Sequence, residues 1–195
     1  MLALGLAVLA LGATGLAVTS CTADADKPAS GQRVTQLPDP GDAIDERLML
    51  SLSLAKNFHH IAKVYMTDGN LDEATAAVQQ ILSIDFPPGA PEGEDVRLDA
   101  HAMLAKLLVA RGKLEDAMTV VDRGIASASR DSFFLANLHT VKGEVYEAQA
   151  AVALDDGAPD AEARARELRH TAITAYTRSN EINEALQKRL VEEPR

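Results

Sequence analysis

The sequence predicts an all-α protein built from helical hairpins, and three observations carry this prediction. Hydrophobic residues make up 47% of the chain but aromatic residues only 4%, which favours stacked helices with small-residue contacts over a β-sandwich. After residue 43, apolar residues recur at helical spacing between breaks that are rich in Gly, Pro and Asp. Two of these stretches match each other at a constant offset of 43 residues.

Residues 2–18 form an apolar run without an ionisable side chain. Such a run is typical of a secretory signal peptide, and we expect residues 1–20 to be one. The segment VTSC, residues 18–21, resembles the lipobox of bacterial lipoproteins, with Val18 in place of the usual Leu. This resemblance implies cleavage before Cys21 and lipid attachment to its sulfur. The alternative is a plain transmembrane anchor, because the run is long enough to span a bilayer.

The chain becomes polar after Cys21. Residues 21–42 are rich in Pro, Gly, Asp and Ser, and we expect them to be a lipidated cysteine followed by a disordered tether. In the enterobacterial sorting rule an Asp after the cysteine retains a lipoprotein in the inner membrane. Thr22 stands there in this chain, so the resemblance favours the outer membrane over the inner one.

Residues 43–67 are predicted to form one long helix with Asp42 as its N-cap. The chain then breaks at Gly69, which adopts the left-handed conformation readily and so ends a helix. Asn70, with a Glu three residues on, predicts a capping box for a second helix. Pro87, followed by a second proline, is predicted to end that helix. The stripe expected to face the core of the first helix is Ile44, Leu48, Ser51, Ala55, Phe58, Ile61 and Tyr65.

Residues 85–95 contain three prolines and two glycines and are predicted to be a loop. The second hairpin, residues 98–131, then repeats the first. The pairs that lie 43 residues apart are Ala62 and Ala105, Gly69 and Gly112, Ala74 and Ala117, and Val78 and Val121. This internal match is the strongest indication of a repeat architecture.

The third hairpin is predicted to begin near Ser132 and to be longer than the other two. Gly143 takes the place of the small residue at Ala62 and Ala105. The first helix is expected to run to about Leu154, and the second from Asp160 to near the end of the chain. This hairpin therefore carries about 17 extra residues between equivalent positions.

The first hairpin resembles a tetratricopeptide repeat (TPR). The family's characteristic positions fall on Phe58, Ile61, Ala62, Tyr65, Gly69, Ala74 and Val78. Pro87 takes the place of the family's terminal proline, one residue later than usual. Phe replaces the usual Trp, Val78 replaces the second aromatic residue, and Ile81 replaces an Ala. The resemblance implies a short right-handed α-solenoid of three TPR-like hairpins at about 55–88, 98–131 and 136–190, the third extended, within a helical domain of residues 43–195. A polar final helix is expected to cap it.

Composition argues against several classes of partner. The chain has 19 Lys and Arg against 29 Asp and Glu, for a net charge of -10. Nucleic-acid binding needs a cationic surface, and binding to anionic lipid headgroups needs basic residues as well, so neither is expected. A single cysteine excludes an intrachain disulfide.

The sequence predicts no catalytic residue, no cofactor and no metal site. It contains no HExxH, CxxC, GxSxG or phosphate-binding loop. His101 and His139 fall at the position of Phe58, where a repeat packs its two helices together, so we expect them to be core or half-buried residues. The open alternative is a histidine-based metal-binding protein that uses His59, His101 or His139.

The TPR resemblance also predicts a binding groove. In that family the first helices of successive repeats line a concave face that binds peptide segments. The matching positions are Lys56, His59, Lys63 and Met66 in the first unit, Lys106 and Val109 in the second, and Thr140 and Glu144 in the third. Lys63 and Lys106 are equivalent, and we expect a positive strip that accepts an acidic segment or a C-terminal carboxylate. The alternative is two ordinary solvated lysines.

Together these patterns predict a non-enzymatic envelope lipoprotein that faces the periplasm and binds a partner protein. TPR lipoproteins of this architecture serve as pilotins for secretins, or as accessories of outer-membrane protein assembly and of cell-wall enzymes. This is a likeness of architecture, and it does not select a partner. Two alternatives stay open: a structural spacer that self-associates through the exposed faces of its terminal helices, and the histidine-based metal-binding protein.

Overall fold

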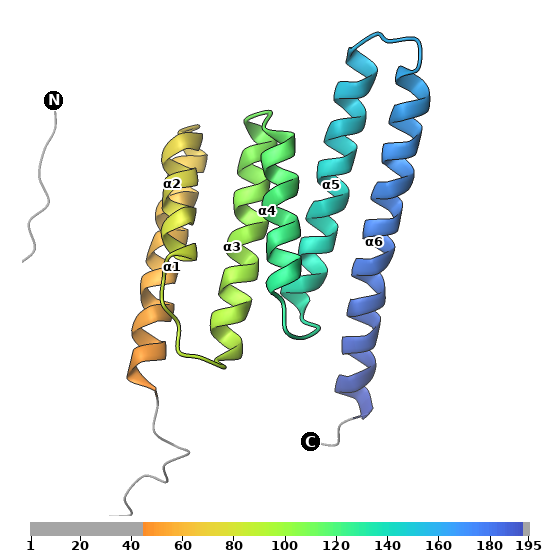
Figure 1. Ribbon diagram of the computed structural model, residues 1–195. Helices are drawn as coiled ribbons and strands as arrows, with labels where there is room; N and C mark the ends of the chain where they lie inside the picture. The colour runs from red at the N-terminus through yellow and green to blue at the C-terminus, as the bar shows by residue number, and fades with distance from the viewer. Residues whose placement is uncertain (1–44, 193–195) are drawn as a thin grey trace, which may run out of the picture. The chain divides into compact units, whose positions relative to one another are not determined.

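The computed structural model describes residues 45–192, which form six α-helices and no β-strand (Figure 1). The helices are α1 (Glu46–Thr67), α2 (Leu71–Leu82), α3 (Pro91–Ala110), α4 (Leu114–Ser127), α5 (Phe133–Asp155) and α6 (Ala161–Glu192). Each odd-numbered helix packs along the helix that follows it, which gives three antiparallel hairpins. α3 also contacts α1, α2 and α5, and α4 contacts α5, so the hairpins pack on one another in chain order. The predicted all-α class is confirmed.

The expected signal peptide (residues 1–20), Cys21 and the tether (residues 21–42) lie outside the described residues. Among the six helices of residues 45–192, none is both long enough and apolar enough to cross a membrane. The lipid anchor and the tether therefore remain predictions from the sequence.

The turns inside the first two hairpins have the same geometry, as the 43-residue repeat predicts. Gly69 and Gly112 both lie in the left-handed region, with φ values of 76° and 71°. In each turn the amide after the glycine donates to the carbonyl five residues back at 2.8 Å, and the glycine amide donates to the carbonyl three residues back. This is the Schellman motif, which satisfies the last carbonyls of the helix.

The small residues at the centre of each hairpin are also equivalent. Ala62, Ala105, Val78 and Val121 are all completely buried. In the third hairpin the same two places hold Gly143 and Tyr176, and a Cβ built on this glycine would lie 2.6 Å from the tyrosine Cζ. A larger side chain on α6 is thus matched by a smaller one on α5, which keeps the interface filled without overlap.

Two helix starts differ from the sequence-based expectation. The N-cap of α1 is Asp45, not Asp42, because the Asp45 carboxylate accepts the backbone amides of Arg47 and Leu48 at 3.0 and 3.2 Å. Asn70 occupies the N-cap position of α2, but its side chain makes no capping hydrogen bond. The predicted capping box is therefore wrong. The Schellman turn that precedes α2 fixes its start through the backbone instead.

The segment between the first two hairpins is shorter than predicted. α2 ends at Leu82, five residues before Pro87, so the prolines do not end it. The chain leaves the helix and buries Phe86, which is 3% exposed. Pro91 is the first residue of α3, a position where proline is well accepted because no amide is needed there. The predicted loop over 85–95 is therefore too long, and the second hairpin starts earlier than expected.

The third hairpin agrees with its predicted limits. Ser132 caps α5, and its Oγ accepts the Leu135 amide at 3.1 Å. α5 ends at Asp155, and α6 continues to Glu192 as the longest helix in the described region. Within residues 45–192, α6 packs against α5 only.

Ile61 does not face the core, although its place in the predicted stripe put it there. Its side chain is 44% exposed, whereas the equivalent Leu104 is 5% exposed. Leu104 lies on α3, which packs on the first hairpin. No described helix covers the corresponding side of α1, which contacts α2 and α3 only.

Candidate binding groove

The predicted groove residues lie on α1, α3 and α5, the first helices of the three hairpins (Figure 1). α3 contacts both α1 and α5, so these three helices are neighbours in sequence order. Four of the predicted residues are exposed, namely Lys56, Lys63, Met66 and Lys106, and four are half-buried, namely His59, Val109, Thr140 and Glu144. The structure divides this set into two regions with different properties.

The first region is a cavity of about 240 Å³ between α1, α3 and the start of α5. Lys56 and His59 line it from α1, together with Asp95 and Asp99 from α3. Its apolar lining includes Leu52, Ala55, Ala100, Met103 and Phe134. The cavity is smaller than the roughly 300–1,000 Å³ of a typical small-molecule site, and its size suits the anchoring of a single apolar side chain.

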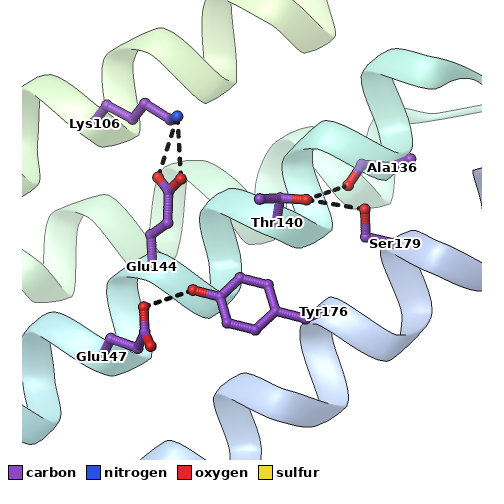
Figure 2. Close-up of polar contacts among 7 residues, drawn as sticks. All are labelled: Lys106, Ala136, Thr140, Glu144, Glu147, Tyr176 and Ser179. Atoms are coloured by element: carbon purple, nitrogen blue, oxygen red, sulfur yellow. Dashed lines mark hydrogen bonds and ion pairs between the residues drawn. The ribbon is translucent and has the colours of Figure 1, made fainter.

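The second region, on α5, is occupied by contacts within the chain (Figure 2). Both carboxylate oxygens of Glu144 lie 3.2 Å from Lys106 Nζ. Thr140 Oγ1 lies 2.9 Å from Ser179 Oγ of α6 and also donates to the Ala136 carbonyl. Because Glu144 neutralises Lys106, the predicted positive strip does not run from Lys63 to Lys106 without interruption.

Positive charge remains at the α1 side of the cavity. In the described part of the chain, Lys56 and Lys63 take part in no ion pair. On the opposite wall, the charge of Asp95 is balanced by Arg130, whose guanidinium lies 2.7 Å from Asp95 Oδ1. Asp99 is left as the acidic group facing this side. Lys56 lines the cavity, and Lys63 lies one turn after His59 on α1 and acts on its imidazole. These two lysines against Asp99 give this side of the cavity a local positive balance in an acidic chain.

His59 contributes a neutral, partly buried ring to the same wall. Partial burial, reinforced by the neighbouring Lys63 ammonium, lowers the pKa of His59 from its usual value, while Asp99 opposes this effect. A neutral imidazole has one donor and one acceptor nitrogen. His59 can therefore hydrogen-bond a peptide group beside the apolar lining.

His101 and His139, the two other histidines of the metal-binding alternative, are buried and half-buried. His101 is 9% exposed, and a Cβ added to Gly124 would lie 2.9 Å from its Cβ. Burial lowers the pKa of His101, with Arg123 adding to the effect, and burial together with Arg178 and Lys142 lowers that of His139. Within residues 45–192 no three His, Cys, Asp or Glu side chains come together in a way that could hold a metal. The metal-binding alternative thus gains no support from the described region.

The apolar lining of the cavity could not be predicted from the sequence as a site, although Ala55 belongs to the predicted core stripe of the first helix. Leu52 lies one turn before Lys56 on α1, and that spacing is the only local signal that the two share a face. Met103 and Phe134 come from later hairpins, and nothing in their own segments indicates that they meet Leu52. Thr140 and Glu144 were predicted to line the groove, but the structure engages them with α6 and α3 instead.

A scan against protein-family models, a search of curated proteins and a search of solved structures each returned no match for this chain.

Proposed function

We propose that the chain is a non-enzymatic adaptor in which a short, right-handed TPR-like solenoid binds a partner protein through the cavity between α1 and α3. The three hairpins packed in chain order support the solenoid. So do the matched turns at Gly69 and Gly112. The third hairpin is the extended one, and α6 is its terminal helix.

The single observation that carries the binding role is the composition of the cavity. It joins apolar side chains from four helices, including Ile81 of α2, to Lys56 and His59. A segment that places one apolar side chain in the cavity and an acidic residue or a C-terminal carboxylate near Lys56 and Lys63 satisfies both features. The apolar contact supplies affinity, while the lysines supply orientation and association rate.

The site favoured by the structure is therefore narrower than the one expected from the sequence. It is centred on Lys56, His59 and Lys63, and it omits Lys106, because Glu144 already neutralises that lysine. A partner segment that suits this region carries an apolar anchor followed or preceded by negative charge.

The location of the adaptor is part of the proposal and rests on the sequence. A lipid on Cys21 holds the protein at the bacterial envelope, facing the periplasm and favouring the outer membrane. A protein acylated on an N-terminal cysteine carries more than one acyl chain, which gives stable anchoring where a single chain does not. Residues 22–42 then provide reach between the membrane and the helical region.

Charge reversal tests the site directly. A tagged chain with Lys56→Glu and Lys63→Glu is expected to recover several-fold less of its partner from cells than the unmodified chain, because like charges replace opposite ones at the rim. The matched control carries Lys113→Glu and Lys188→Glu, which make the same change in net charge on exposed positions outside the cavity. Equal loss of partner in both variants would show that net charge, and not this site, governs binding.

A further inference from the structure

One face of α1 carries an exposed apolar stripe. Leu50, Leu54, Ile61 and Val64 are 72%, 47%, 44% and 60% exposed. With Asn57 between them, they follow one another at spacings of four, three, four and three residues. This is the spacing of the a and d positions of a coiled coil. We refer to these five residues as the α1 stripe.

The repeat shows what this face does elsewhere in the fold. The residues 43 positions after Asn57, Ile61 and Val64 are Ala100, Leu104 and Leu107, which are 3%, 5% and 1% exposed. They lie on α3, which packs against α1 and α2 of the preceding hairpin. The residue equivalent to Leu54 is Arg97, whose guanidinium lies 5.0 Å from the Phe86 ring centroid. The face that is interior on α3 is thus open on α1 in the described residues.

We propose that the α1 stripe packs against the α1 stripe of a second copy of this chain, forming a two-fold symmetric dimer. The alternative of head-to-tail stacking places α6 of one copy on α1 of the next. The exposed apolar residues of α6, namely Ile173, Leu190 and Val191, do not form such a stripe. Arg169, His170, Thr174 and Thr177 surround Ile173, and Leu190 and Val191 lie at the far end of the helix. A symmetric contact pairs the α1 stripe with a surface that has the same apolar spacing.

The area of the α1 stripe is that of a small dimer interface. If a fully exposed aliphatic residue presents roughly 180 Å², the exposed fractions correspond to about 400 Å² for the four apolar residues, within the size range of functional apolar patches. Complete burial of these side chains in two copies would remove about 800 Å² from water, which corresponds to a weak dimer that a covalent cross-link can trap.

The four apolar residues supply the affinity of the contact, and Asn57 restricts its register. A buried amide in the core of a helix pair must find a hydrogen-bonding partner across the interface, which favours pairing of the two Asn57 side chains. Asn57 lies in the middle of the stripe, with two apolar residues on each side. A purely apolar stripe would not restrict the pairing in this way.

The dimer does not depend on the proposed binding role. Lys56 and Lys63 lie about 100–120° around α1 from Asn57, so the cavity between α1 and α3 stays open in the dimer. Loss of partner binding and loss of self-association are therefore separate outcomes, caused by changes on different sides of the same helix.

Cysteine cross-linking of the full chain in cells tests the proposal. With Asn57→Cys, a short bis-maleimide is expected to shift most of the chain from the monomer band to a band of twice its mass, because Asn57 lies near the two-fold axis in either helix orientation. Lys63→Cys, an exposed position on the other side of α1, is the matched control and is expected to remain monomeric. The unmodified chain, whose only cysteine is Cys21, gives the baseline.

A second variant distinguishes loss of the dimer contact from loss of the fold. Adding Leu54→Glu and Ile61→Glu to Asn57→Cys is expected to abolish the dimer band while helix content stays unchanged, since both side chains are exposed in the monomer. Absence of a dimer band with Asn57→Cys would overturn the proposal. Equal cross-linking from Lys63→Cys, or capture of a different protein from residue 57, would overturn it as well.

Discussion

The contact between Gly143 of α5 and Tyr176 of α6 predicts that the effect of Gly143→Ala on the free energy of unfolding changes sign when the tyrosine ring is removed. Replacing a glycine within a helix by alanine stabilises the helix by about 1 kcal/mol. At Gly143, however, the new Cβ would lie 2.6 and 2.8 Å from two atoms of the Tyr176 ring. Overpacking of this kind costs about 1–3 kcal/mol. Gly143→Ala is therefore expected to lower the free energy of unfolding by up to about 2 kcal/mol.

The outcome reverses when the ring is removed. Tyr176→Val places at this position the residue found at Val78 and Val121, and it eliminates the close approach. In that background Gly143→Ala is expected to raise the free energy of unfolding by about 1 kcal/mol, the helix-propensity gain alone. Tyr176→Val by itself is destabilising, because it also removes the hydrogen bond of 2.7 Å from the tyrosine hydroxyl to Glu147.

Urea denaturation of the four chains in this double-mutant cycle measures the coupling, which is expected to be about 1–3 kcal/mol. Thermal unfolding gives an independent reading, because 1 kcal/mol corresponds to about 2–4 °C in a domain of this size. If Gly143→Ala stabilises the unmodified chain as much as it stabilises the Tyr176→Val chain, the close packing of α5 on α6 is refuted.

Three further predictions concern the turns, a buried histidine and the ion pair of Figure 2. Gly69→Ala and Gly112→Ala are each expected to lower the free energy of unfolding, measured by urea denaturation, by about 1 kcal/mol, since the positive φ disfavours a residue with a Cβ. No atom lies within 4 Å of the added Cβ, so a steric clash does not add to this cost. A large difference between the two variants would contradict the equivalence of the turns. Burial lowers the pKa of His101 below its usual 6.5, so on acidification His101 is protonated in the unfolded chain before it is protonated in the folded chain. The contribution of the neutral, buried His101 to stability is therefore fully present above about pH 6.5 and is lost as the pH falls towards the folded-state pKa. His101→Leu should flatten the fall in melting temperature over that range, and an unchanged slope would exclude His101 as its cause. A double-mutant cycle on Lys106 and Glu144, using Lys106→Met and Glu144→Gln, should give a coupling below about 1 kcal/mol, because the pair is partly exposed; a coupling of several kcal/mol would contradict this assignment.

Sequence patterns were most informative where the chain repeats itself. The offset of 43 residues correctly indicated which glycines turn the chain and which alanines and valines are fully buried. These positions are determined by local geometry and by contacts within one hairpin. Such contacts leave a periodic trace in the sequence. The limits of α5 and the end of α6 were predictable for the same reason.

Contacts between hairpins were not predictable in this way. Leu52 and Phe134 line one cavity although they are far apart in the chain, and no periodicity links them. The pairing of Lys106 with Glu144 likewise follows from the packing of α3 on α5. Helical spacing placed Ile61 in the core because it identifies an apolar face, but it does not show whether another element covers that face.

The helix caps illustrate a further limit of prediction from the sequence. Asp42 and Asp45 both precede an apolar helix, and both residue types suit an N-cap. The choice of Asp45 depends on where the backbone enters the helix, which the side chains of neighbouring residues do not determine. The same holds for Pro91, which was assigned to a loop by its type and instead begins α3.

The central claim, that the cavity beside α1 binds a partner, is tested most directly by photo-cross-linking in living cells. A photoreactive residue placed at Lys63 is expected to capture one dominant envelope protein, and Lys56→Glu is expected to reduce that capture. The same residue at Thr174, on the exposed side of α6, is expected not to capture it. Capture of unrelated abundant proteins from Lys63, or equal capture from both positions, would contradict the account.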